Sequence, residues 1–267
     1  MFKPVVLAAL LALSAPPVLA TTQGDVLVAE ILPGWRTDHG THIAALHLKL
    51  APDWKTYWRA PGDTGIPPLF DWSGSENLGA VRVHWPRPHV FHVNGMQSIG
   101  YKTDLVLPIE VTAKDPTRAI HLRASIDLGV CRDICMPAEL SLSAELAGPG
   151  AADAVISAAL ADRPDTPAEA GMAAIACKVE PIADGLRLTA EIDLPVTGTM
   201  ETVVMEPGAA GVWASEAVVA RVGRRLTASV DLVPESGEPF ALDRAAVTLT
   251  VLGDDRAVEI PGCPAAP

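Results

Sequence analysis

The sequence lacks the short motifs of the common hydrolases and phosphate-binding proteins. It contains no G-x-S-x-G nucleophile elbow, no H-E-x-x-H zinc motif and no Walker loop. One D-T-G string occurs at residues 63–65, but an aspartic protease needs a second carboxylate beside the first. We expect Asp63 to cap a turn in this Gly- and Pro-rich stretch. These absences argue against hydrolases and nucleotide-dependent enzymes of those classes.

Long apolar runs are also scarce. The best candidate lies at the N-terminus, where Lys3 precedes an apolar run over residues 5–13 that is too short to span a bilayer. Residues 18–20 form a small-residue cleavage site, so residues 1–20 are predicted to be a secretory signal peptide cut after Ala20. An uncleaved anchor is the alternative. We expect an exported protein, in which disulfides persist.

Positively charged side chains are few. The chain has 20 Lys and Arg against 32 Asp and Glu, a formal net charge of −12 at pH 7. Nucleic acids and anionic membrane surfaces attract basic proteins, not acidic ones. We therefore expect no nucleic-acid partner.

Helical periodicity is nearly absent, and short runs that alternate apolar and polar residues dominate instead. Such alternation is typical of half-buried strands, and Pro- and Gly-rich turns separate the runs. We predict strands over residues 42–50, 81–85, 104–111, 120–128, 139–146, 186–194, 200–207, 217–222, 224–233 and 245–252. The predicted fold class is all-β, built from antiparallel β-sandwiches.

A change in composition separates the two strand-rich halves. Residues 151–162 are Ala-rich with an apolar face, which predicts a short helix, and residues 165–170 are rich in Pro and Ala, which is typical of a linker. We predict a first β-sandwich domain over 21–150, a helix and linker over 151–170, and a second, smaller β-sandwich over 171–267. The second half has few His and aromatic residues, so we expect a supporting or docking role for it.

Only four cysteines occur, and they form two unlike pairs. In GVCRDICMP, three residues separate Cys131 from Cys135, and the flanking strand patterns predict a hairpin with both cysteines at its base. A bond there would contribute about 2 kcal/mol in the loop-entropy model, whereas a Cys177–Cys263 bond, closing about 87 residues, would contribute about 4.5 kcal/mol. We predict a structural Cys177–Cys263 disulfide, with free thiols or a second redox pair as alternatives.

The short pair has three interpretations on spacing alone. It is compatible with a redox pair, because an exposed disulfide in a tight loop is readily opened by another thiol. It is also compatible with a structural staple or with a metal site. The residues themselves leave these three interpretations open.

A longer pattern surrounds this pair. Residues 54–78, WKTYWRAPGDTGIPPLFDWSGSENL, are followed by HWPRP and by GVCRDICMPAE. Together these strings resemble the periplasmic N-terminal domain of DsbD-type thiol:disulfide interchange proteins, closest to the ScsB-like branch. The resemblance covers about residues 25–150 strongly and the second half more loosely.

The resemblance implies an immunoglobulin-like sandwich that carries Cys131 and Cys135 as the redox-active pair of a protein-disulfide reductase. Cys135 would be the exchange sulfur, which forms a mixed disulfide with the substrate protein. Cys131 would be its resolving partner. The family also implies a cap loop whose aromatic side chains shield the pair. Tyr57, Trp58 and Phe70 match in character, with core packing as the alternative for each. No cofactor or metal is implied.

The same resemblance implies the partners. Such domains take electrons from a membrane-embedded thiol–disulfide carrier and pass them to periplasmic thioredoxin-fold proteins, so the expected location is the periplasm. Full-length members continue into a membrane domain and a thioredoxin-like domain, whereas this sequence ends at Pro267. We expect either that a separate membrane protein supplies the electrons or that the function has changed.

Two other functions are compatible with the sequence. Copper binding is one, because Sco-type copper proteins also use CxxxC before Pro, and His84, His89, His92 and Met96 suit copper. The strand pattern after Cys135 contradicts the Sco architecture, and we expect these histidines to lie in a packed or solvated loop. The other is a β-sandwich adaptor whose disulfides never exchange.

Overall fold

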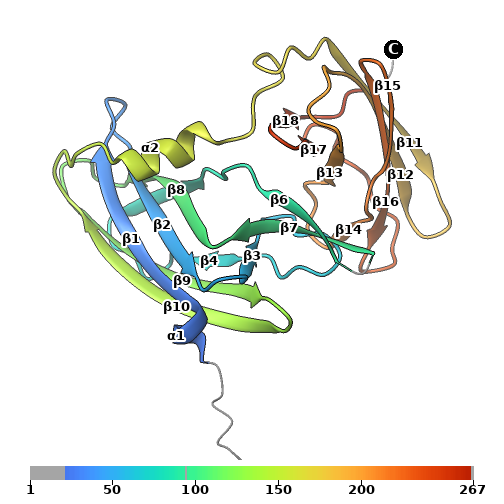
Figure 1. The fold of residues 1–267 in the computed structure, drawn as a ribbon. Helices are drawn as coiled ribbons and strands as arrows, with labels where there is room; N and C mark the ends of the chain where they lie inside the picture. The colour runs from blue at the N-terminus through green and yellow to red at the C-terminus, as the bar shows by residue number, and fades with distance from the viewer. Residues whose placement is uncertain (1–21, 94, 266–267) are drawn as a thin grey trace, which may run out of the picture.

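The computed structural model describes residues 22–93 and 95–265, and the predicted signal peptide lies outside these residues. The described chain is mostly strand and folds into four antiparallel sheets, two from each half of the sequence (Figure 1). The predicted β-rich, antiparallel architecture is therefore confirmed. Within the described ranges, no helix has both the length and the apolarity needed to cross a bilayer.

The first half of the chain forms two sheets. One has the order β1-β2-β8-β5, and the other has the order β10-β9-β3-β7-β6, with β4 also paired to β9. The strands of the first sheet are β1 (Leu27–Arg36), β2 (His42–Leu50), β8 (Asp104–Ala113) and β5 (Leu78–Val83). Those of the second are β10 (Cys135–Leu146), β9 (Ile120–Cys131), β3 (Lys55–Tyr57), β7 (Met96–Lys102), β6 (His89–Val93) and β4 (Leu69–Asp71).

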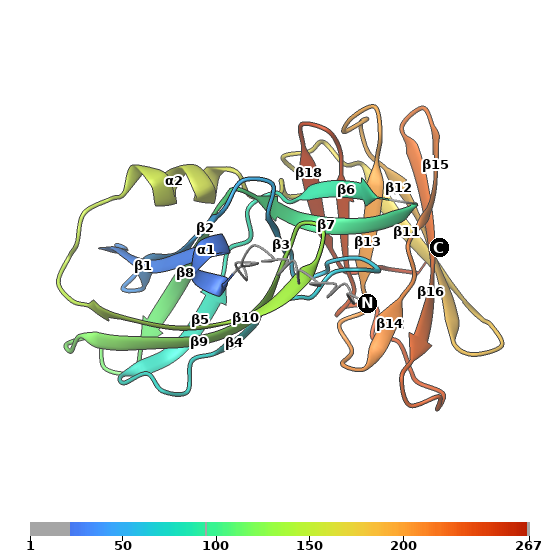
Figure 2. The same cartoon turned by 60° about the horizontal axis from the view of Figure 1, so that its bottom comes forward.

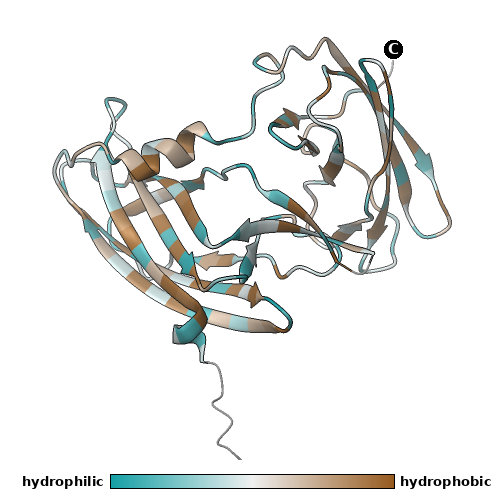
Figure 3. Ribbon diagram, in the orientation of Figure 1, coloured by the Kyte–Doolittle hydropathy of each residue, from teal (hydrophilic) through white to brown (hydrophobic). Residues whose placement is uncertain are grey.

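These two sheets pack face to face because their strands alternate apolar and polar side chains, as the banding along the strands in Figure 3 shows. In β9, every second residue from Ile120 to Leu128 is buried, and the residues between them are exposed. Leu46 and Leu107 from one sheet meet Ile126 from the other in a single apolar core. The alternation read from the sequence thus defines which face of β9 points inward.

Two short helices flank this half. α1 (Gln23–Val26) precedes β1, and α2 (Ala154–Ala161) begins after Asp153, whose carboxylate accepts hydrogen bonds from two backbone NH groups of the first turn. Ile156 is buried against β2 and β8, so α2 covers the outer face of the first sheet (Figure 1). The helix predicted within residues 151–162 is confirmed.

The second half of the chain also forms two sheets around one core. The larger has the order β11-β12-β16-β14, with β15 also paired to β16, and the smaller has the order β13-β17-β18. Leu188 and Ile192 from the larger sheet meet Leu249 and Ile260 from the smaller one. The strands are β11 (Ala174–Pro181), β12 (Leu186–Asp193), β13 (Thr202–Glu206), β14 (Val212–Ala214), β15 (Val218–Val222), β16 (Arg225–Pro234), β17 (Thr248–Leu252) and β18 (Ala257–Pro261).

A disulfide closes this second core. Cys177 lies on β11, Cys263 follows β18, and both residues are almost fully buried. The Arg244 guanidinium donates hydrogen bonds to the carbonyl oxygens of both cysteines, at 3.1 and 3.3 Å. The bond therefore ties the first strand of this half to the residues after its last strand.

The two halves lie against each other, and no strand of one pairs with a strand of the other in the described chain (Figure 2). We propose that the boundary between two domains lies near residues 150–170. The segment predicted as a linker is attached to the second half, because the backbone NH of Asp165 donates to the Ala257 carbonyl at 2.8 Å. Its carbonyl accepts a hydrogen bond from Glu259 at 2.9 Å, and Arg256 pairs with its carboxylate.

Removing the two disulfides should destabilise the protein unequally. The Cys177–Cys263 bond spans 86 residues of sequence and the Cys131–Cys135 bond spans 4. In the loop-entropy model, replacing the long-range pair by serine costs about 4.5 kcal/mol and replacing the short pair costs about 2 kcal/mol. Urea denaturation of the two double variants, followed by circular dichroism, measures both losses. An equal loss, or a larger loss for the short pair, would contradict a structural role for Cys177–Cys263.

Candidate functional site

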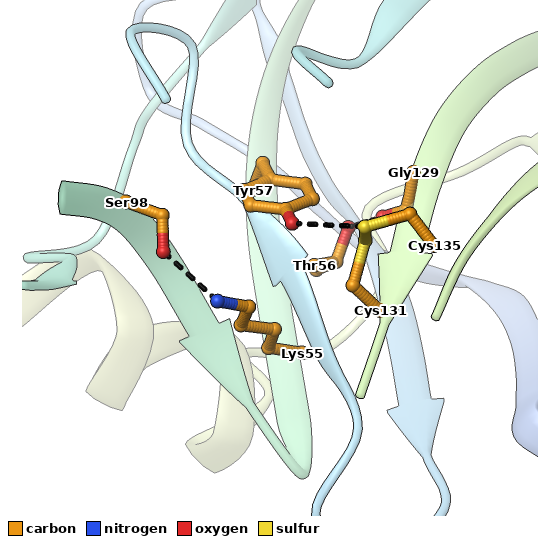
Figure 4. The surroundings of a disulfide bond; sticks show 7 residues. All are labelled: Lys55, Thr56, Tyr57, Ser98, Gly129, Cys131 and Cys135. Carbon is orange, nitrogen blue, oxygen red and sulfur yellow. Dashed lines mark hydrogen bonds between the residues drawn. A yellow bond between two sulfur atoms is a disulfide. The ribbon is translucent and has the colours of Figure 1, made fainter. Parts of the chain in front are cut away.

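The Cys131–Cys135 disulfide sits at the end of the β9–β10 hairpin (Figure 4). The two strands pair without a break from Cys131 opposite Cys135 to Ile120 opposite Leu146. The two cysteine Cα atoms are 4.1 Å apart, and the backbone NH of Arg132 donates to the Ile134 carbonyl at 3.0 Å across the tip. The hairpin predicted from the strand patterns is therefore confirmed.

The two sulfurs of this disulfide belong to residues with unequal exposure. Cys131 is 1% exposed, because β9 lies between β10 and β3 and its last residue is covered. Cys135 is exposed, because it begins β10, which is the edge strand of the sheet. An incoming thiol therefore has access to the bond from the side of Cys135.

Tyr57 brings a hydroxyl to the exposed cysteine. It lies on β3, which pairs with the end of β9, so that Lys55 faces Cys131. The Tyr57 hydroxyl lies 3.6 Å from Cys135 Sγ, and the ring is almost fully buried (Figure 4). Burial raises the pKa of Tyr57 above its ordinary value, so the hydroxyl stays protonated at neutral pH and can donate to the sulfur.

A second layer covers Tyr57 and the strand beside it. We call residues 58–68, which connect β3 to β4, the cap segment. A Cβ atom at Gly65 would lie 2.8 Å from the Tyr57 ring, and one at Gly129 would lie 2.7 Å from Ile66 Cβ. These close approaches show that the cap segment packs directly on Tyr57 and on β9 two residues before Cys131.

The charges at the hairpin tip are compensated, whereas Lys55, which faces Cys131 in the strand pairing, has no carboxylate partner among the described residues. Arg132 lies over the Trp54 ring at 5.5 Å and pairs with Asp133 at 2.9 Å, so neither charge acts alone on the hairpin tip. The Lys55 ammonium donates to Ser98 Oγ at 2.9 Å and lies over the Tyr57 ring at 5.7 Å. Burial, and then the nearby Lys102, lower the pKa of Lys55.

The three aromatic residues suggested for shielding occupy different places. Tyr57 reaches the disulfide, whereas Trp58 is fully buried in the core between the sheets. Phe70 faces Ile126 on β9 and stacks on Trp72 with 5.8 Å between ring centroids. Ile126 lies five residues before Cys131, about 16 Å along the strand. These positions favour core packing for Trp58 and Phe70.

Two contributors to the site were missed at the sequence level. Gly129 interrupts the apolar and polar alternation of β9, and a glycine inside a strand pattern often marks a close approach of another segment. Ile66 is the single large apolar residue in the string GDTGIPP, between a glycine and two prolines. Both signals are present in the sequence, but neither indicates which distant residue makes the contact.

The histidines considered as copper ligands lie in different surroundings. His84 Nε2 lies 3.2 Å from Glu110 Oε2, and His89 and His92 are exposed on strand β6 rather than in the loop that we expected. Across residues 22–93 and 95–265, no three His, Cys, Asp or Glu side chains gather in a group that could hold a metal ion.

Comparison with known proteins connects the disulfide to a family. Residues 28–146, which contain both sheets of the first half and the cysteine hairpin, match the family described as "Thiol:disulfide interchange protein DsbD, N-terminal". The crystal structure of the N-terminal periplasmic domain of ScsB from Proteus mirabilis has a similar fold, with a TM-score of 0.68 and 22% sequence identity. The alignment covers 93% of this chain and 97% of that one, so the likeness extends over both halves. A search of curated proteins found no match. Residues 28–146 of this chain therefore form a domain that belongs to the DsbD N-terminal family.

Proposed function

We propose that this chain is a periplasmic thiol–disulfide exchange protein that works through Cys131 and Cys135. It relays electrons between a membrane-embedded thiol–disulfide carrier and periplasmic thioredoxin-fold proteins. Family membership of residues 28–146 supports the class of reaction. The observation that carries the residue assignment is the asymmetry of the pair, with Cys135 exposed on an edge strand and Cys131 buried behind it.

The exchange proceeds in two balanced displacements. In the reduced protein, the Cys135 thiolate attacks one sulfur of a partner disulfide, which forms a mixed disulfide and releases the partner's other sulfur as a thiolate. The Cys131 thiolate then attacks Cys135 Sγ, which restores the Cys131–Cys135 bond and releases the reduced partner. Two electrons pass to the partner, and its two sulfurs take up the protons. The membrane carrier reverses the sequence by reducing the Cys131–Cys135 bond.

The second disulfide is assigned a structural role. Both Cys177 and Cys263 are enclosed in the core of the second half, where no partner protein reaches their sulfurs without local unfolding. Their long span in sequence also makes the bond a strong constraint on the unfolded chain. These two properties are the opposite of those of the Cys131–Cys135 pair.

The domain arrangement completes the proposal. We assign residues 21–150 to an immunoglobulin-like sandwich and residues 171–267 to a second, smaller sandwich, with the helix and linker at 151–170 between them. The support is that each half has two packed antiparallel sheets around its own core. Residues 1–20 are assigned as the cleaved signal peptide, in keeping with the periplasmic location of the ScsB domain that the fold resembles.

Single cysteine variants should trap different amounts of partner. Cys131→Ala leaves Cys135 without a resolving thiol, so a mixed disulfide with a periplasmic thioredoxin-fold protein should accumulate. Cys135→Ala leaves a buried Cys131 thiol and should give little adduct. Non-reducing gel electrophoresis of the two variants, each with Cys177–Cys263 intact, measures the difference. Equal trapping, or more trapping by Cys135→Ala, would reverse the roles assigned to the two cysteines.

Removal of the Tyr57 hydroxyl should slow the reaction of Cys135. In the reduced protein this hydroxyl is placed to donate to the Cys135 thiolate, and such a bond contributes about 0.5–1.5 kcal/mol net. We therefore expect Tyr57→Phe to lower the alkylation rate of Cys135 by iodoacetamide at neutral pH about three- to tenfold. Because the bond favours the charged form, the pH of half-maximal reactivity should rise in the variant.

The chain offers a matched control for this hydroxyl. Tyr101, the other tyrosine, donates to the Pro86 carbonyl at 2.8 Å in the core of the first half. Tyr101→Phe should leave the alkylation of Cys135 and its pH profile unchanged. If Tyr57→Phe also leaves both unchanged, the hydroxyl does not act on the sulfur.

A further inference from the structure

The three-stranded sheet β13-β17-β18 has packing contacts on both of its faces. Side chains alternate between the two faces of each strand, so Met205 and Leu249 point into the core of the second half. Val204, Leu252 and Ala257 lie on the opposite face and pack against the core of the first half. The sheet therefore contributes side chains to the cores of both halves and lies where the two halves meet (Figure 2).

Two glutamates on the face toward the first half hold one arginine. Glu206 on β13 and Glu259 on β18 face β17 residues that are two apart, Thr248 and Thr250, so both carboxylates lie on that face. Arg59 Nε and Nη2 donate to the Glu206 carboxylate at 3.0 and 2.9 Å, and Nη2 also donates to Glu259 at 2.5 Å. This guanidinium from the first half is thus bound by two strands of the second.

The environment of Arg59 makes this contact a specific one. Its side chain is 25% exposed, and the guanidinium lies over the Trp58 ring at 4.5 Å. Burial by itself would lower the pKa of Arg59, but the hydrogen bonds and charges of Glu206 and Glu259 more than offset it and raise the pKa. A two-pronged guanidinium–carboxylate contact fixes orientation as well as distance.

Arg59 belongs to the cap segment, which packs on Tyr57 and on β9 two residues before Cys131. The first residues of this segment are held along β7, because Trp58 NH donates to the Ile99 carbonyl at 3.0 Å and Ile99 NH donates to the Pro61 carbonyl at 2.8 Å. Further along, Ile66 packs on Gly129. A continuous set of contacts therefore runs from the two carboxylates through the cap segment to the strand that carries Cys131.

We propose that Arg59 is a positioning residue through which the second half of the chain controls access to the Cys131–Cys135 disulfide. Clamped by Glu206 and Glu259, it holds the cap segment closed on β9 and on Tyr57. The side of the disulfide toward Cys131 is thereby closed to small thiols, whereas the exposed side of Cys135 stays open. This inference rests on the proposed function only for the identity of the exchanging disulfide.

Loss of the arginine should open the cap segment without unfolding the protein. Without Arg59, Glu206 and Glu259 face each other with no cation between them, and like charges in a partly buried site repel. The apolar contacts of Val204, Leu252 and Ala257 with the first half remain. Local detachment of the cap segment is therefore the expected response.

The test is the rate at which dithiothreitol opens each disulfide in the oxidised, full-length chain. Thiols released over time are alkylated, and their peptides are quantified by mass spectrometry. In Arg59→Gln we expect opening of Cys131–Cys135 to be at least about fivefold faster than in the unmodified protein. Opening of Cys177–Cys263 should stay unchanged, and amide hydrogen exchange should increase in residues 58–68.

Two further variants keep the test decisive. Glu206→Gln with Glu259→Gln removes the clamp from the other side and should also accelerate opening, even if Arg59→Gln folds poorly. Arg187→Gln breaks an ion pair of the second half, with 2.7 Å between Arg187 and Asp231, far in sequence from the cap segment. It should leave both disulfides unchanged.

The outcomes separate this inference from the proposed function. Opening of Cys131–Cys135 within twofold of the unmodified rate in both clamp variants would overturn the role of Arg59. Faster opening of both disulfides together would show general destabilisation and would overturn it as well. A small thiol needs no protein partner, so failure of the chain to exchange with thioredoxin-fold proteins would refute the proposed function and leave this result standing.

Discussion

The unbroken pairing of β9 with β10 is the constraint on which the candidate site depends. It places Cys131 directly opposite Cys135, and a slip of one residue would separate them and turn every side chain of the slipped strand to the other face. The buried residues of β9, from Ile120 to Leu128, make such a slip costly because they fill the core between the sheets. The apolar core therefore sets the geometry of the disulfide from a distance.

The same bond type serves two purposes because its surroundings differ. At the hairpin end, one sulfur belongs to an exposed residue on an edge strand, and Tyr57 and the cap segment control the rest of its environment. In the second half, Cys177 and Cys263 are sealed inside a core and held near Arg244. The two disulfides have the same covalent structure. Their different reactivity follows from the exposure of their cysteines and from the residues around them.

Each of the ten predicted strands overlaps an observed strand, but other strands and part of the site were not predicted. Regular alternation is a local signal, so β2, β9 and β16 were found close to their observed bounds. The strands β3, β4, β6, β14 and β18 were missed, because three to five residues carry too little periodicity. The longer strands β1, β7 and β11 were missed as well. Packing between distant segments has no local signal: Ile66 on Gly129, and Arg59 with carboxylates 147 and 200 residues away, emerge only when the chain is folded. For the same reason, sequence alone did not distinguish Tyr57 at the disulfide from Trp58 in the core.

The reduction potential of the Cys131–Cys135 pair tests the central claim most directly. It is measured by equilibrating the full chain with redox buffers of known potential, with Cys177–Cys263 as an internal reference. Structural disulfides of secreted proteins typically lie below about −300 mV, whereas exchange proteins range from roughly −270 to −120 mV. The account predicts that Cys131–Cys135 falls in the upper range and Cys177–Cys263 in the lower one. A potential below about −300 mV for both pairs would contradict it.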